Sequence, residues 1–207
     1  MEAVAVILAA GAGKRMGGRA KASLLLPEGC TFLSAVAASA RAGGCRRVLV
    51  VVGRPHGQET RAAALAAGVT EIVENPHPDR GMSSSLAVAL DHLDPGGVDV
   101  ALAWPVDHAR VHASTVVAIL GASGRDQIVV PTSSLGRGGH PTAFGAFLWP
   151  ELRDVAALPD GARAVVRADS ARVVRVGVSD PGAFCDIDTP DDLAAIRTGP
   201  TTGHRQS

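Results

Sequence analysis

Short apolar segments alternate with helical patterns along this chain, and this alternation restricts the possible fold more than any other feature. The expected strands are uninterrupted apolar runs at residues 4–8, 48–52, 71–73, 98–103 and 128–130. The expected helices between them cover residues 32–42, 58–67, 83–93 and 114–120. Strands that are apolar on both faces need helices on both faces, and such alternation is typical of a parallel sheet. The sequence therefore predicts an α/β fold, a three-layer α/β/α sandwich with a Rossmann-like, mainly parallel sheet.

The pattern becomes irregular after Pro131. Two further strands are expected at residues 142–144 and 173–178. We interpret this part as an insertion that carries one side of a ligand site, before the chain returns to that site near Asp186. A last helix is expected to begin at Pro190, with Thr189 as its cap.

The length and composition of the chain limit its class. With 207 residues it suits one domain, residues 1–197, and the polar residues 198–207 are expected to form a disordered tail. The formal net charge of zero argues against a general nucleic-acid binder. No apolar run approaches the ~20 residues of a membrane span, and no signal-peptide pattern opens the chain. Three widely spaced cysteines form neither a metal motif nor a disulfide framework, so a cytoplasmic protein is expected.

The loop after the first expected strand combines small residues with positive charge. Residues 9–21 read A-A-G-A-G-K-R-M-G-G-R-A-K, and this segment contains the only two lysines of the chain, Lys14 and Lys21. Small residues let backbone N–H groups approach a polyphosphate, and the cations match its charge. The segment fits neither a P-loop nor the dinucleotide-binding pattern. It therefore predicts a phosphate-binding loop of another kind, with a basic surface turn as the alternative.

Two acidic segments lie where ligands of a parallel sheet are expected. Asp107 follows the strand at 98–103, at the carboxyl edge of the sheet. Its carboxylate could hold Mg²⁺, which prefers oxygen ligands, or could cap the next turn. Asp186 and Asp188 alternate on an extended segment, so only one of them can face inward.

These segments together resemble a known enzyme family. The string L-A-A-G-A-G-K-R-M-G at residues 8–17, P-V-D-H at 105–108 and D-I-D-T-P-D-D at 186–192 resemble nucleotidyltransferases of the molybdenum cofactor cytidylyltransferase type. The similarity extends over residues 4–197. It implies transfer of CMP from CTP to a phosphorylated acceptor, the molybdenum cofactor, with release of pyrophosphate. It also implies a molybdoenzyme maturation partner.

The resemblance assigns roles to individual residues. Arg15 and Lys21 would hold the triphosphate, while Asp107 and Asp188 would hold Mg²⁺ with Asp186 in support. The nucleotide would contact Leu8, Ala9, Ala10, Gly11, Gly13, Gly81, Met82 and Ser83. The acceptor would contact His140, in an R-G-G-H-P segment, and Arg163, in a G-A-R segment. Since facing carboxylates repel each other without metal, Asp107→Asn is expected to stabilise the metal-free protein.

Alternative functions remain open at this point. The acceptor could be a sugar 1-phosphate or methylerythritol phosphate, and the donor could be GTP. The Ala10 methyl leaves less room for a purine than a glycine would, which favours CTP. A non-catalytic nucleotide-binding or regulatory protein is also conceivable, although both carboxylates and Lys21 argue against it.

Overall fold

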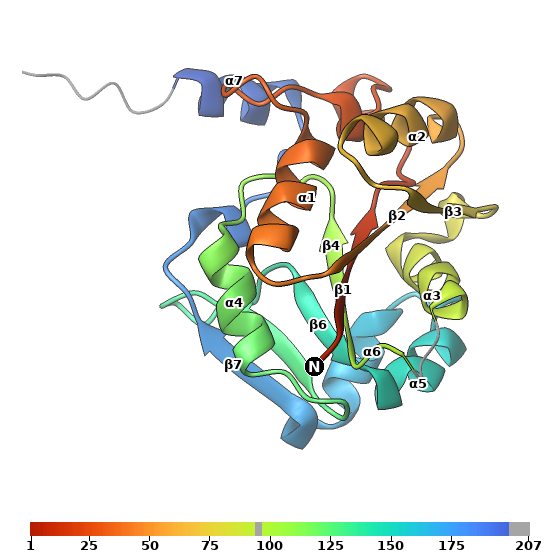
Figure 1. Ribbon diagram of the computed structural model, residues 1–207, viewed down its shortest axis with the longest axis vertical. Helices are drawn as coiled ribbons and strands as arrows, with labels where there is room; N and C mark the ends of the chain where they lie inside the picture. Colours follow the sequence, from red (N-terminus) through yellow and green to blue (C-terminus); the bar gives the residue numbers. More distant parts are fainter. Residues whose placement is uncertain (94–96, 199–207) are drawn as a thin grey trace, which may run out of the picture.

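A seven-stranded sheet runs through the part of the chain that this computed structural model describes, residues 1–93 and 97–198 (Figure 1). The strand order is β3-β2-β1-β4-β6-β5-β7. The strands are β1 (Ala3–Leu8), β2 (Arg47–Gly53), β3 (Glu71–Asn75), β4 (Val100–Pro105), β5 (Ile128–Thr132), β6 (Thr142–Gly145) and β7 (Val173–Gly177). Only β6 runs antiparallel to its neighbours, β4 and β5. The predicted α/β class with a mainly parallel sheet is confirmed.

Helices cover both faces of the sheet. One face carries α1 (Phe32–Ala42), α2 (Gly57–Ala66), α4 (Ala113–Gly121) and α7 (Pro190–Thr198), and the other carries α3 (Met82–His92), α5 (Trp149–Asp154) and α6 (Ala162–Ala168). Successive residues of β1 alternate between the two cores, with Ala5 and Ile7 in the first and Val6 and Leu8 in the second. Because every residue of β1 is buried, the uninterrupted apolar run is explained by helices on both sides.

The predicted strand and helix boundaries differ from the observed ones by at most two residues. The largest shift that concerns the site is in β4, which ends at Pro105 instead of residue 103. Proline has no N–H to donate, but the pairing of β4 with β6 has already ended at Ala103. On the other side, the Val106 N–H donates to the Leu8 carbonyl at 3.2 Å. The edge of the sheet therefore lies directly before Asp107.

The expectation of an insertion after Pro131 is wrong. Strands β5, β6 and β7 continue the same sheet, with β5 parallel to β7. Helices α5 and α6 have no counterpart in the sequence-based prediction. They have only six and seven residues, and the segment between them contains Pro159 and Gly161, so neither shows a clear helical period.

The chain returns to the end of β4 through a tightly bonded segment. The buried carboxylate of Asp180 accepts hydrogen bonds from the Thr115 hydroxyl at 2.6 Å and the Gly182 N–H at 3.0 Å. Further on, the Ile187 N–H donates to the Asp107 carbonyl at 3.1 Å. The residue after Ile187 is thereby held beside Asp107.

The C-terminal helix starts as predicted. The Thr189 hydroxyl accepts a hydrogen bond from the Asp192 N–H at 3.2 Å, so Thr189 caps α7. Of the predicted tail, Thr198 ends α7, and residues 199–207 lie outside the described residues. No helix within the described ranges is long and apolar enough to cross a membrane.

Candidate functional site

A cavity of about 610 Å³ lies at the carboxyl edge of the sheet, where the sequence places its ligand site. Its walls come from the loops that follow β1, β2, β3 and β4, and from the segment that returns to β4 at Asp188. We call it the loop cavity, because the glycine-containing loop at residues 9–15 supplies more of its lining than any other segment.

The conformation of that loop depends on a glycine at position 13. Gly13 has φ +60°, and a Cβ there would lie 2.0 Å from the carbonyl oxygen of Arg19. The N–H groups of Met16 and Gly18 both donate to the Gly13 carbonyl at 2.9 Å. The Met16 side chain is buried in the core and thereby fixes this end of the loop to the body of the protein. Glycine is therefore required at this position for the chain to close on itself.

Lys21 joins the two carboxylates that the sequence singled out. The buried residues Ala20 and Ala22 fix its backbone, and its Nζ lies 2.8 Å from the Asp107 Oδ2 while also contacting the Asp188 carboxylate. Arg15 reaches Asp188 from the cavity rim, with its own side chain 75% exposed. Two cations and two carboxylates from three distant segments thus meet at one point.

The carboxylates determine the charge state of Lys21. Burial alone would lower the lysine pKa, but Asp107 and Asp188 outweigh this effect and raise the pKa above its ordinary value. The lysine is therefore an ammonium that pairs with both carboxylates. This corrects the expectation that Asp107→Asn would relieve repulsion in the metal-free protein, because the substitution removes an ion-pair partner of Lys21 instead.

The same two carboxylates suit a magnesium ion. Both contact one ammonium group, so they converge on one cationic position. Their oxygens are ligands that Mg²⁺ prefers, and Mg²⁺ commonly completes its shell with substrate phosphates and water. No group of three or more His, Cys, Asp and Glu side chains suited to a metal occurs among the described residues. Asp186, predicted to support the ion, is exposed and outside the cavity lining.

The structure brings together six of the eight predicted nucleotide contacts. The loop cavity is lined by Leu8, Ala9, Ala10, Gly11, Gly13 and Gly81. Met82 and Ser83 line a second cavity instead. The Ser83 hydroxyl accepts a hydrogen bond from the Ala162 N–H at 3.0 Å, which turns this side chain toward α6. Their predicted contact with the nucleotide has no support in this placement.

Sequence reasoning missed Arg54 as a lining residue of the loop cavity. A signal was available, because Arg54 directly follows the buried strand β2 at the same edge of the sheet as Asp107. Asp79 and Val106 also line the cavity without having been predicted.

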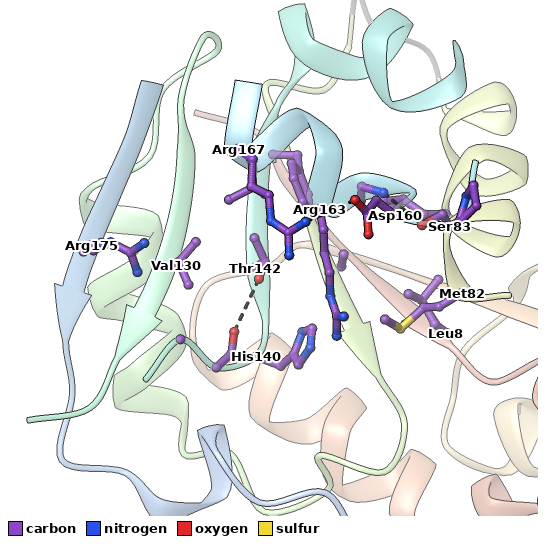
Figure 2. Close-up of a pocket in the computed structure, with 18 of the residues that line it drawn as sticks. Leu8, Met82, Ser83, Val130, His140, Thr142, Asp160, Arg163, Arg167 and Arg175 are labelled. Carbon is purple, nitrogen blue, oxygen red and sulfur yellow. Dashed lines mark hydrogen bonds and ion pairs between the residues drawn. The ribbon is translucent and has the colours of Figure 1, made fainter. Parts of the chain in front are cut away.

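The second cavity, of about 630 Å³, shares Leu8 with the loop cavity. Its lining includes both predicted acceptor residues, His140 and Arg163, together with Arg167 and Arg175 (Figure 2). We call it the arginine cavity. Two adjoining cavities that meet at the end of β1 can hold two ligands side by side.

His140 is held as a neutral side chain between the cavity and the core. Its ring lies 4.8 Å from the ring of His108, centroid to centroid, and its buried Nδ1 has no hydrogen-bond partner among the described residues. Burial and the neighbouring His108 lower the pKa of His140 to about 4. His140 can therefore offer a neutral hydrogen-bonding group to a ligand at pH 7.

Comparison with known proteins now decides the family. The sequence model of the family described as the MobA-like NTP transferase domain matches residues 5–173 of this chain. The chain belongs to this family. It is therefore a nucleotidyltransferase, and the resemblance stated from the sequence is confirmed at the level of the family.

Two relatives of this chain carry the names of different enzymes. It is 33% identical to the molybdenum cofactor guanylyltransferase of Cereibacter sphaeroides, over 94% of this chain and 95% of that protein. It is 32% identical to the nicotine blue oxidoreductase of Paenarthrobacter nicotinovorans, over 91% and 93%. Among solved structures, a nucleotidyl transferase from Methanothermobacter thermautotroptrophicus aligns with a TM-score of 0.79 at 26% identity, covering 95% of this chain and 96% of that one.

The two lysines of the loop offer a matched test of the site. We expect Lys21→Ala to lower kcat/KM by roughly 10²–10³, the scale for removing one fixed electrostatic donor. Lys14→Ala should have much less effect, because Lys14 is exposed at the rim and forms no ion pair within the described ranges. Steady-state kinetics of pyrophosphate release measures both. Equal losses for the two variants would contradict the placement of Lys21.

The lowered pKa of His140 predicts an acid-sensitive fold. The unfolded chain binds a proton near pH 6.5 and the folded chain only near pH 4. The contribution of His140 to the free energy of unfolding is therefore fully present above pH 6.5 and is lost as the pH falls toward 4. Between pH 7 and pH 5 the loss is about 1–2 kcal/mol. Urea unfolding at these two pH values should show this loss in the wild type and a smaller one in His140→Gln. The same pH dependence in both proteins would contradict the assignment.

Proposed function

We propose that this chain transfers CMP from CTP to a phosphorylated acceptor, the molybdenum cofactor, and releases pyrophosphate. The observation that carries the proposal is the meeting of Lys21, Asp107 and Asp188 in the loop cavity, which shares Leu8 with the arginine cavity. The likeness to a molybdenum cofactor guanylyltransferase supports this acceptor class. A cytoplasmic location and a molybdoenzyme maturation partner remain predictions from the sequence.

The proposed reaction needs no nucleophile from the protein. An anionic oxygen of the acceptor phosphate attacks the α-phosphorus, and the bond from this phosphorus to the oxygen bridging to the β-phosphate breaks. Pyrophosphate leaves with the electron pair of that bond. What the chain supplies is position and charge compensation, the two contributions on which phosphoryl transfer mainly depends.

The side chains that the resemblance singled out each have a role in this scheme. The loop backbone at residues 9–13 approaches the triphosphate, and Arg15 and Lys21 offset its negative charge. Mg²⁺ bound to Asp107 and Asp188 would act as a Lewis acid and neutralise charge on the α-phosphate. Arg163 and His140, which line the arginine cavity, would face the acceptor.

Lys21 has to change partners when substrates bind. Its ammonium lies where both carboxylates converge, so it and a divalent cation compete for the same position. A triphosphate in the loop cavity offers the lysine new anionic partners close by. In this scheme, Lys21 would leave the aspartates for the phosphates of the bound nucleotide, and the two carboxylates would then be free to hold the ion.

The choice of CTP over GTP depends on Ala10. This residue lines the loop cavity and is 4% exposed, and its Cβ lies so close to Gly53 that a Cβ added there would be only 2.9 Å away. Packing against Gly53 leaves the methyl group no room to retreat from a larger base. GTP is the competing donor, because one relative is named a guanylyltransferase.

Pyrophosphate release with each of the four nucleoside triphosphates and each candidate acceptor tests the proposal. The acceptors are the molybdenum cofactor, a sugar 1-phosphate and methylerythritol phosphate. We expect CTP with the molybdenum cofactor to give the highest kcat/KM, with GTP at least about tenfold lower, the scale of a one-methylene steric difference. Ala10→Gly should lower the ratio of kcat/KM with CTP to kcat/KM with GTP, because it removes the methyl group that limits the room for a purine. Equal or faster turnover with GTP would contradict the choice of nucleotide, and no release with any pair would contradict the proposed function.

A further inference from the structure

Three arginine side chains enter the arginine cavity from two different elements. Arg163 and Arg167 project from α6, where a spacing of four residues places them on the same face of the helix, and Arg175 projects from β7 (Figure 2). The resemblance to the family assigns a role to Arg163 alone. The other two guanidinium groups have no part in the scheme above.

The charge in this cavity is not balanced by the protein. Asp160 is the only carboxylate among the described lining residues, and it pairs with Arg167 at 3.1 Å. Arg163 and Arg175 form no ion pair within the described ranges. By contrast, Arg172, three residues from Arg175, is neutralised by Glu151 at 2.6 Å. Uncompensated cations gathered in a concave site raise the local concentration of anions, so the cavity is suited to an anionic ligand.

The arginines are spread along the cavity. In Figure 2, Arg175 lies beside Val130 on the side opposite Leu8 and Met82, with Arg163 and Arg167 between. Leu8 marks the end that adjoins the loop cavity, since it lines both. A phosphate that attacks a nucleotide in the loop cavity belongs at that end, so Arg175 faces a different part of the acceptor.

We propose that Arg167 and Arg175 form an anion subsite that selects acceptors carrying a second anionic group, at the end remote from the attacking phosphate. Guanidinium groups suit this task because their fork of N–H donors matches an oxyanion in two places. The substrate class is an extended phosphomonoester with a distal oxyanion. This inference rests on the proposed function, which places the attacking phosphate near Leu8.

Binding of simple probes tests the subsite without any turnover. The probes are an alkylphosphonate and an alkane bisphosphonate of equal chain length, in a series of lengths, titrated by calorimetry. We expect the wild-type protein to bind the best bisphosphonate about tenfold or more tightly than its matched monophosphonate, as one added charge-assisted contact would give. Arg175→Gln, and independently Arg167→Gln, should remove this preference and leave monophosphonate binding unchanged.

Arg61→Gln is the matched control, because Arg61 is an exposed arginine on α2 outside both cavities. It should keep the full preference. Equal binding of both probes by the wild type, or an equal loss in the Arg61 variant, would overturn the subsite. The pyrophosphate assay separates the two proposals: without release from any nucleotide, a preference that depends on Arg175 still supports the subsite while the proposed function fails. Release without that preference leaves the function and overturns the subsite.

Discussion

The ion cluster of Lys21 with Asp107 and Asp188 is the contact on which the rest of the site depends. Its members lie 86 and 167 residues apart in the sequence. Parallel pairing of β1 with β4 brings the loop that carries Lys21 to the same sheet edge as Asp107. The hydrogen bond from Ile187 to the Asp107 carbonyl then adds Asp188. The fold thus assembles three distant charges with backbone bonds that do not involve those charges.

This arrangement solves a physical problem of the free protein. Asp107, Asp188 and Lys21 have side chains only 13–20% exposed, and partly buried charges are unfavourable unless they are paired. Lys21 supplies the pairing before any cation or nucleotide arrives. The site can therefore form before any ligand binds. Lys21 then occupies the position of the ion and would have to leave the carboxylates before they could hold a metal.

Features encoded locally were predictable from the sequence. The apolar strands, the glycine-containing loop and the aspartates at 107 and 188 each lie in a short segment whose pattern indicates its role. Helices α5 and α6 were missed because they are short. The strand β6 was predicted, but its antiparallel direction was not, because four residues carry no sign of strand direction. The alternation of Asp186 and Asp188 left open which of them faces inward, and only the resemblance to the family favoured Asp188. The hydrogen bond from the Ile187 N–H to the Asp107 carbonyl, which no local pattern shows, holds Asp188 beside Asp107.

Side chains that meet only through tertiary structure were not predictable. Arg167 and Arg175 share a cavity because β7 pairs with β5 and α6 packs in the same core as Val173 of β7, so neither arginine stands out along the chain. Met82 and Ser83 were assigned to the nucleotide along with Gly81. The positive φ of Gly81, +91°, turns the chain there, and the next two residues line the neighbouring cavity.

We propose that Asp107 and Asp188 together hold one divalent cation beside the nucleotide. Binding of Mn²⁺ as a probe, followed by electron paramagnetic resonance in the presence of CTP, measures this directly. We expect one tight Mn²⁺ site in the wild type, weakened at least about tenfold by Asp107→Asn and by Asp188→Asn. Asp186→Asn, a change of the exposed neighbouring carboxylate, should leave it intact. Unaltered Mn²⁺ binding in either of the first two variants, or an equal loss in the third, would contradict the account.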